Sequence, residues 1–180
     1  MAAVNRDLIY YVRATLIAAI MIVAWVARAD AATLHPVRDV AARVAPGAIV
    51  TCDSLPDLYG DSWPADDGIH IRLSRPMCSG LARLAAHTIR DWSNSANALE
   101  TLLHERDHWP VGYPPDGEPE GVAECNALGS MRYWLHRLGY TGASATRLLR
   151  AAWATHETLP SNYLGRCVSP FERRVPIVRP

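Results

Sequence analysis

Hydrophobic and polar residues alternate along residues 69–73, IHIRL, which is the pattern of a β-strand with one buried face. The apolar stretch 48–52, AIVTC, predicts a second strand. Residues 53–68, which separate them, are rich in Asp, Pro and Gly, so we expect a surface loop there. Residues 32–43 have a weaker pattern that is compatible with a short helix, and a Pro-Gly pair shortly downstream would end it.

Helical spacing of apolar residues follows in the middle of the chain. Residues 79–92 and 96–109 both place apolar side chains three or four positions apart, which predicts two helices. Ser95 or Asn97 is the expected N-cap of the second helix, because both side chains can accept a hydrogen bond from the first turn. Residues 110–119 are interrupted by Pro and Gly, and they predict a loop.

Two more helices are predicted in the last third of the chain. Residues 120–138 have a broad apolar face, and Gly139 stands just past the end as a C-cap. Residues 144–159 form the next predicted helix, which Pro160 would end. A small sheet in the first half and helices in the second predict an α+β fold with a mostly helical C-terminal half.

The first 31 residues have the order of a secretory signal peptide. Two arginines lie among the first 13 residues, an apolar run covers residues 15–27, and small residues follow. Cleavage after Ala29 or Ala31 would fit the requirement for small side chains at those subsites. The alternative is an uncleaved membrane anchor, because residues 8–27 are long enough to span a bilayer. Either interpretation predicts a secreted or cell-envelope protein.

Length and charge limit the remaining possibilities. Residues 32–180 are enough for one domain with a single core. The chain has 18 basic and 18 acidic residues, so its formal net charge is zero. This balance disfavours a nucleic-acid partner, and contact with a membrane is expected only through the N-terminal segment.

The four cysteines indicate an oxidising compartment. They are widely spaced, even in number and located beyond the leader, which is typical of two disulfides. Three pairings are possible. We expect Cys52 to pair with Cys78 and Cys125 with Cys167, because each bond would join segments that the predicted elements place side by side.

Residues 104–108 read H-E-x-x-H within a predicted helix. His104 and His108 lie on one helical face about one turn apart, so both can direct a ring nitrogen at the same metal ion. Glu105 is about 100° further round the helix, where it can reach a water bound to that ion but cannot ligate comfortably with the histidines.

A catalytic zinc site usually has a third protein ligand. A third histidine, as in H-E-x-x-H-x-x-G-x-x-H, is excluded because Val111 and Pro114 occupy the required positions. Glu120 and Glu124 lie one turn apart at the start of the next predicted helix. The first can therefore ligate while the second accepts a hydrogen bond from a ligand histidine.

The two motifs together resemble those of the gluzincin class of zinc metallopeptidases, in which H-E-x-x-H is followed by a helix reading E-x-x-A-[D/E/N]. Glu120, Ala123 and Glu124 match that second pattern, and the resemblance covers about residues 95–138. The general layout is also similar to that of small exported proteins of uncharacterised role that have a zincin motif and two cysteine pairs.

The resemblance implies a zincin-like domain with Zn²⁺ held by His104, His108 and Glu120. It implies Glu105 as the general base in the hydrolysis of a peptide or protein substrate. Glu124 is then the outer partner of a ligand histidine, although the roles of the two later glutamates remain open to exchange.

Two further parts of such a site are expected. An oxyanion formed during hydrolysis needs a stabilising group, and Tyr113, His156 and Tyr163 are the candidates. In the resembled class, an edge strand beside the metal helix holds the substrate by main-chain hydrogen bonds. Residues 69–73 are the expected counterpart of that strand.

Two functions therefore remain. The preferred one is an exported zinc-dependent peptidase. The alternative is a disulfide-stapled binding or envelope protein that retains the zincin fold without activity. The two functions differ at Glu105 and in metal occupancy. A purely structural zinc is disfavoured, because three protein ligands leave one position open.

Overall fold

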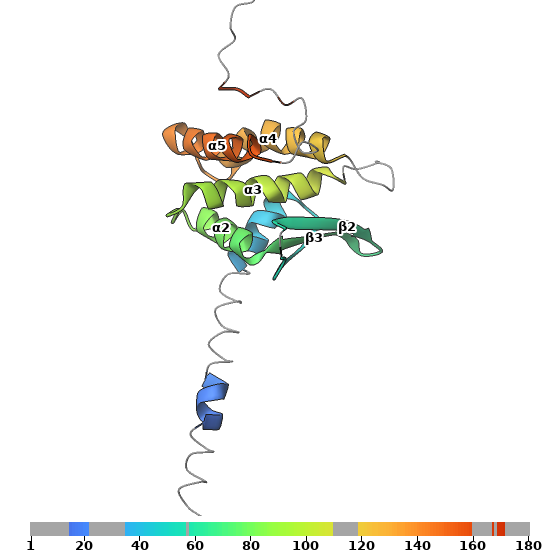
Figure 1. Cartoon of the computed structure of the whole chain (residues 1–180), viewed down its shortest axis with the longest axis vertical. Helices are drawn as coiled ribbons and strands as arrows, with labels where there is room; N and C mark the ends of the chain where they lie inside the picture. Colours follow the sequence, from blue (N-terminus) through green and yellow to red (C-terminus); the bar gives the residue numbers. More distant parts are fainter. Residues whose placement is uncertain are drawn as a thin grey trace, which may run out of the picture.

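The computed structural model describes residues 15–21, 35–56, 58–109, 119–159, 167 and 169–171. These residues form an α+β fold in which a three-stranded sheet lies beside a larger helical body (Figure 1). Residues 15–21 are helical. The rest of the predicted leader, most of the predicted loop 110–119, and Pro160 lie outside the described residues. None of the described helices is long and apolar enough to cross a bilayer.

One mixed sheet contains the strands β1 (Ile49–Asp53), β2 (Gly60–Ala65) and β3 (Gly68–Ser74) in the order β1-β3-β2. β1 is parallel to β3, and β2 is antiparallel to it. Ile71 and Leu73 of β3 are fully buried. The strands predicted from residues 48–52 and 69–73 are thus confirmed, with bounds shifted by one residue.

The prediction of a loop over residues 53–68 is wrong, because this stretch contains β2. None of the side chains of β2 is fully buried, so the strand lacks the apolar alternation by which a half-buried strand is recognised. Its Pro64 is compatible with an edge strand, where a missing N–H costs least. Gly68 follows in a left-handed conformation, with φ at 133°, and begins β3.

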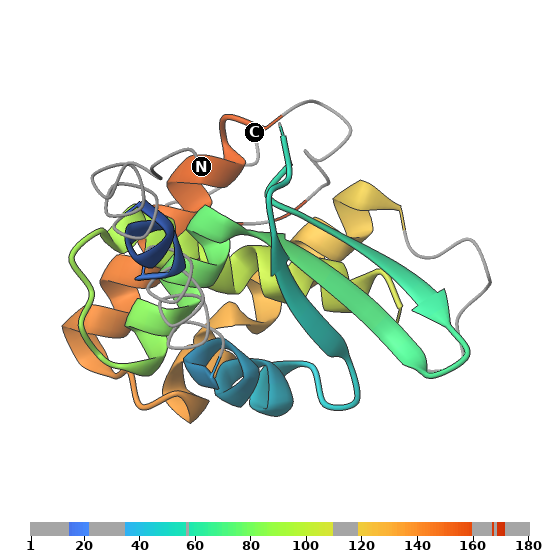
Figure 2. The ribbon, with the colours of Figure 1, turned by 90° about the horizontal axis from the view of Figure 1, so that it is seen from below.

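The prediction of residues 69–73 as an edge strand is also wrong. β3 is the central strand and pairs with a neighbour on both sides. Hydrophobic alternation reports which face of a strand is buried, but it does not report which strands flank it. β2 is the edge strand that contacts α3, and in Figure 2 the three strands lie side by side with β2 at one margin.

The predicted helices are all present. They are α2 (Arg75–Ala85), α3 (Trp92–Asp107), α4 (Glu120–Arg137) and α5 (Gly142–His156). Residues 35–44 form the expected short helix near the start of the domain.

Several helix ends differ from the predictions. α2 begins four residues earlier than expected and ends before His87, which has a left-handed backbone with φ at 53°. Ser95 and Asn97 do not cap α3. Asp91 does so, because its Oδ1 accepts a hydrogen bond from the backbone N–H of Asn94 at 3.0 Å. Gly139, with φ at 89°, follows the end of α4 as predicted.

α3 lies at the centre of the fold. Figure 1 shows it between a layer formed by α4 and α5 and a layer formed by α2 and the sheet. Leu99, Leu102 and Leu103 have no exposed surface, because neighbours cover the helix on several sides. A helix buried in this way is held in a fixed position, and its last turns carry the H-E-x-x-H motif.

Both predicted disulfides are confirmed. Cys52 of β1 is bonded to Cys78 of α2, and Cys125 of α4 is bonded to Cys167. The first bond attaches the sheet to the helical body, and the second attaches the C-terminal segment to α4. Each is expected to stabilise the fold by about 2 to 4 kcal/mol, mainly by restricting the unfolded chain.

We expect Gly80→Ala to lower the free energy of unfolding by about 1 to 3 kcal/mol. A Cβ at Gly80 would lie 2.7 Å from the Cβ of Ala98 and 2.7 Å from the carbonyl oxygen of Asn94, so α2 would have to move away from α3. Gly129→Ala in α4 is the matched control, because a Cβ there meets nothing within 4 Å. That change should raise the free energy of unfolding by about 0.5 to 1 kcal/mol. Urea titration of both variants checks the prediction, and equal effects would contradict it.

Candidate metal centre

The last turn of α3 brings the two motif histidines together. The backbone N–H of His108 donates to the carbonyl oxygen of His104 at 3.2 Å, so helical geometry continues through the cap residue. The two Nε2 atoms lie 3.0 Å apart. The expectation that both rings face one point is therefore met.

Glu120 is the first residue of α4 and lies opposite this turn. Its Oε2 is 3.0 Å from Nε2 of His104 and 3.5 Å from Nε2 of His108. These residues form one of the groups whose donor atoms could hold a metal ion. We call Nε2 of His104, Nε2 of His108 and Oε2 of Glu120 the ligand triangle. Its members come from both sides of the segment 110–118, so residues separated in sequence meet at one point.

The ligand triangle has the dimensions of a metal site. In a tetrahedral zinc site, neighbouring donor atoms are about 3.3 Å apart, which is close to the three distances found here. A point in the plane of the triangle lies about 1.8 Å from each atom, so an ion just off that plane would make bonds of roughly 2.0 to 2.1 Å. Two imidazoles and a carboxylate therefore fit a divalent ion in number, type and spacing.

The ligand triangle is closed on one side and accessible on the other. His104 is buried, with 5% of its surface exposed, whereas the side chain of Glu120 is 41% exposed. Burial opposes a charge on His104, yet hydrogen bonds with Glu120 and Glu124 raise its pKa to about 10. Hydrogen bonds from the two histidines lower the pKa of Glu120. A cation bound at the ligand triangle would take the place of the positive charge on His104, which Glu120 and Glu124 now stabilise.

Glu105 contacts the strand β2 through one of its carboxylate oxygens. The hydroxyl of Ser62 donates to its Oε2 at 2.7 Å, and the indole N–H of Trp109 donates to Oγ of Ser62 at 3.0 Å. β2 can approach this closely because of Gly60, where a Cβ would lie 3.2 Å from Cγ of Glu105. Burial raises the pKa of Glu105, and the hydrogen bond from Ser62 opposes that rise.

A buried network lies behind His104. Nδ1 of His104 donates to Oε2 of Glu124 at 3.1 Å, and Nδ1 of His156 donates to Oε1 of the same carboxylate at 2.8 Å. Glu124 thus has the contact expected of an outer partner. Glu100, His104 and Glu124 form a second group of donor atoms close enough to hold an ion. Which of Glu120 and Glu124 ligates a metal remains a prediction.

The candidates for an oxyanion stabiliser fall into two groups. Tyr113 and Tyr163 lie outside the described residues. His156 is buried and is directed at Glu124, on the Nδ1 side of His104, and so does not face the ligand triangle. The described residues thus place His156 in the buried network.

Sequence reasoning missed two participants, namely Ser62 and Glu100. Ser62 was hidden within the predicted loop. Glu100 precedes His104 by one helical turn, and that spacing was a usable signal. Trp109 also lines a largely apolar cavity of about 460 Å³ together with Ile69 and Ile71 of β3.

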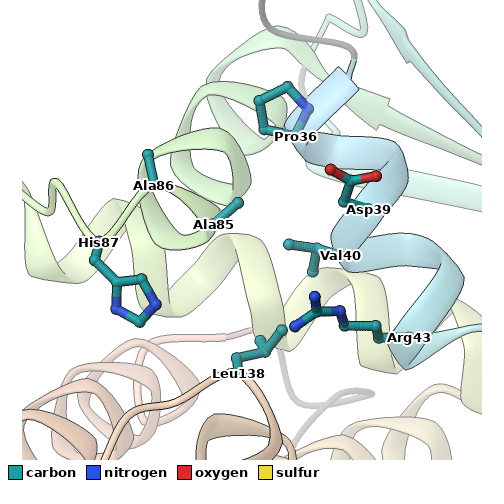
Figure 3. Close-up of a pocket in the computed structure, with 8 residues that line it drawn as sticks. All are labelled: Pro36, Asp39, Val40, Arg43, Ala85, Ala86, His87 and Leu138. Carbon is teal, nitrogen blue, oxygen red and sulfur yellow. The ribbon is translucent and has the colours of Figure 1, made fainter.

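A second cavity, of about 280 Å³, shares no residue with the ligand triangle. Figure 3 shows Arg43 of the helix 35–44 and His87 on opposite sides of it. Leu138 forms part of its wall. The ring of His87 stacks on Tyr140, with the centroids 4.7 Å apart. This cavity lies where the helix 35–44 meets the ends of α2 and α4.

Comparisons with protein-family models, curated proteins and solved structures find no match to this chain. The functional argument therefore depends on the geometry of the site itself.

We expect His108→Ala and Glu120→Ala to abolish stoichiometric zinc binding, because each removes one corner of the ligand triangle. The loss of affinity should exceed the roughly 10- to 100-fold typical of an outer partner. His35→Ala is the control, since this histidine is highly exposed and pairs with Asp39, away from the ligand triangle. Competition with a chromophoric chelator measures the affinity. Full zinc occupancy in the Glu120 variant would exclude Glu120 as a ligand.

Proposed function

We propose that the protein is an exported zinc-dependent peptidase with a zincin-like domain. The observation that carries the proposal is the convergence of His104, His108 and Glu120 on one point. Glu105, the next residue of the motif, lies beside this point without sharing it. This is the relation between metal ligands and a general base that H-E-x-x-H requires.

Zinc is the ion that this donor set favours. Two imidazoles with one carboxylate are a known ligand set of catalytic zinc, and three protein ligands leave a fourth position open. The exposed side of Glu120 gives that position access to solvent. A structural zinc site would instead be expected to have four protein ligands.

When bound, zinc polarises a carbonyl group and lowers the pKa of water. Glu105 supplies the proton transfer. It accepts a proton from the attacking water and returns it to the leaving amine. Its burial raises its pKa, which favours the return of the proton to the leaving amine. Ser62 holds one carboxylate oxygen, so the side chain is oriented before the substrate binds.

The edge strand β2 is the proposed substrate-binding element. Among the described residues, no strand pairs with the edge of β2 that faces away from β3. An extended peptide can add there as a further strand through main-chain hydrogen bonds. Ser62 lies on β2 and contacts Glu105, so a peptide bound along this edge would pass close to the general base.

Export is supported by the disulfides. Both bonds close in the structure, and all four cysteines are used. Disulfides persist in oxidising compartments, which agrees with the signal-like order of residues 1–31. We therefore include a secreted or cell-envelope location in the proposal.

We expect Glu105→Gln to retain zinc and to lower peptide turnover by about 10² to 10⁴ fold. Glutamine keeps the size of the side chain and can still contact Ser62, but it cannot accept the proton of the attacking water. A broad peptide library supplies the substrate, and the zinc content is measured on the same sample.

Glu157→Gln is the matched control, because it removes an exposed carboxylate that also follows a histidine. Its turnover should equal that of the wild type. Zinc loss in the Glu105 variant would show that Glu105 helps to hold the metal. Zinc binding by the wild type without cleavage of any library peptide would favour a catalytically inactive binding or envelope protein.

A further inference from the structure

The carboxylate of Glu124 accepts hydrogen bonds from side chains on two other helices. It lies on α4 with 2% of its surface exposed, between His104 of α3 and His156 of α5. One carboxylate oxygen accepts from His104 at 3.1 Å, and the other accepts from His156 at 2.8 Å. Because each oxygen has its own imidazole donor, the plane of the carboxylate is fixed by both contacts.

Glu100 of α3 lies beside this carboxylate, close enough for Glu100, His104 and Glu124 to form a group that could hold an ion. Burial raises the pKa of Glu100 well above its usual range. His104 and Glu100 both lie on α3, whereas His156 contacts Glu124 from α5. The contact from α5 therefore opposes rotation of the carboxylate towards α3.

His156 is itself well fixed. It is the last residue of α5, is 6% exposed, and packs edge-on against the ring of Trp153 with the centroids 5.5 Å apart. Within the described part of the chain, its hydrogen bond to the metal centre is the one to Glu124. This carboxylate is therefore the route by which His156 can act on the ligand triangle.

We propose that His156 is a positioning residue of the metal centre. The Nδ1–H of His156 holds Glu124 against Nδ1 of His104. This contact fixes the tautomer of His104 and keeps its Nε2 in place as one corner of the ligand triangle. The inference rests on the proposed metal site, but it does not require peptidase activity. If His156 has this role, α5 affects the affinity for the metal although none of the proposed ligands lies on it.

His156→Leu tests this role, because leucine fills a similar volume but has no hydrogen-bond donor. We expect zinc affinity to fall about 10-fold, within the range typical of outer partners. His156→Asn should recover most of the affinity, since its amide nitrogen takes the place of Nδ1. His156→Gln puts the amide nitrogen further from the backbone, near the position of Nε2, and should behave like the leucine variant. The asparagine and glutamine variants provide the comparison if the leucine variant does not fold.

A double-mutant cycle separates positioning from a loss of packing. In a Glu124→Ala background, His156→Leu should change zinc affinity by less than about twofold, because the partner through which it acts is absent. Tyr140→Phe is the control for a general loss of stability. It removes a buried hydrogen bond of 2.7 Å to the carbonyl oxygen of Leu84, which lies outside the metal centre, and should leave zinc affinity unchanged.

The outcomes distinguish this inference from the proposed function. If the wild type binds zinc and the His156 variants retain its affinity, the positioning role is wrong and the metal site stands. The same conclusion follows if His156→Leu lowers affinity equally with and without Glu124. If the wild-type protein binds no zinc, both the metal site and the role of His156 are wrong.

Discussion

The burial of ionisable groups at the end of α3 is the constraint on which the rest of the structure depends. His104, Glu105 and Glu124 are nearly inaccessible to water, and each would be costly to bury without partners. Every one of them is paired with a group from another element. Removing one partner from such a network typically costs about 3 to 5 kcal/mol. The positions of β2, α4 and α5 around α3 are therefore set by hydrogen bonding as well as by apolar packing.

In this arrangement each helix or strand around α3 contributes a different group to the site. α3 and its C-cap residue supply two imidazoles and Glu105, the proposed general base, and the start of α4 supplies the carboxylate on the accessible side of the site. β2 contacts Glu105 through Ser62, while α5 contacts the buried carboxylate of Glu124. The disulfides add covalent connections between the sheet and α2 and between α4 and the C-terminal segment. An isolated helix with the same motif would have none of these supports.

The parts of the site that depend on helical periodicity were predictable from sequence. The spacing of His104 and His108 and the position of Glu120 at a helix start translate directly into geometry. The contacts that depend on tertiary packing were not predictable. Ser62 lies on a strand without a buried apolar face, and β3 proved to be central because β2 covers one of its edges. The sequence suggested His156 as a candidate oxyanion stabiliser, whereas its contact with Glu124, 32 residues away in sequence, depends on tertiary packing.

The location of a bound ion tests the central claim most directly. A crystal of the mature protein soaked in zinc should show one strong anomalous peak at the zinc absorption edge. We predict that the peak lies about 2.0 to 2.1 Å from Nε2 of His104 and of His108 and from a carboxylate oxygen of Glu120, with a fourth position open to solvent. A peak on the Nδ1 side of His104, between Glu100 and Glu124, would contradict the account, and so would the absence of any peak at the ligand triangle.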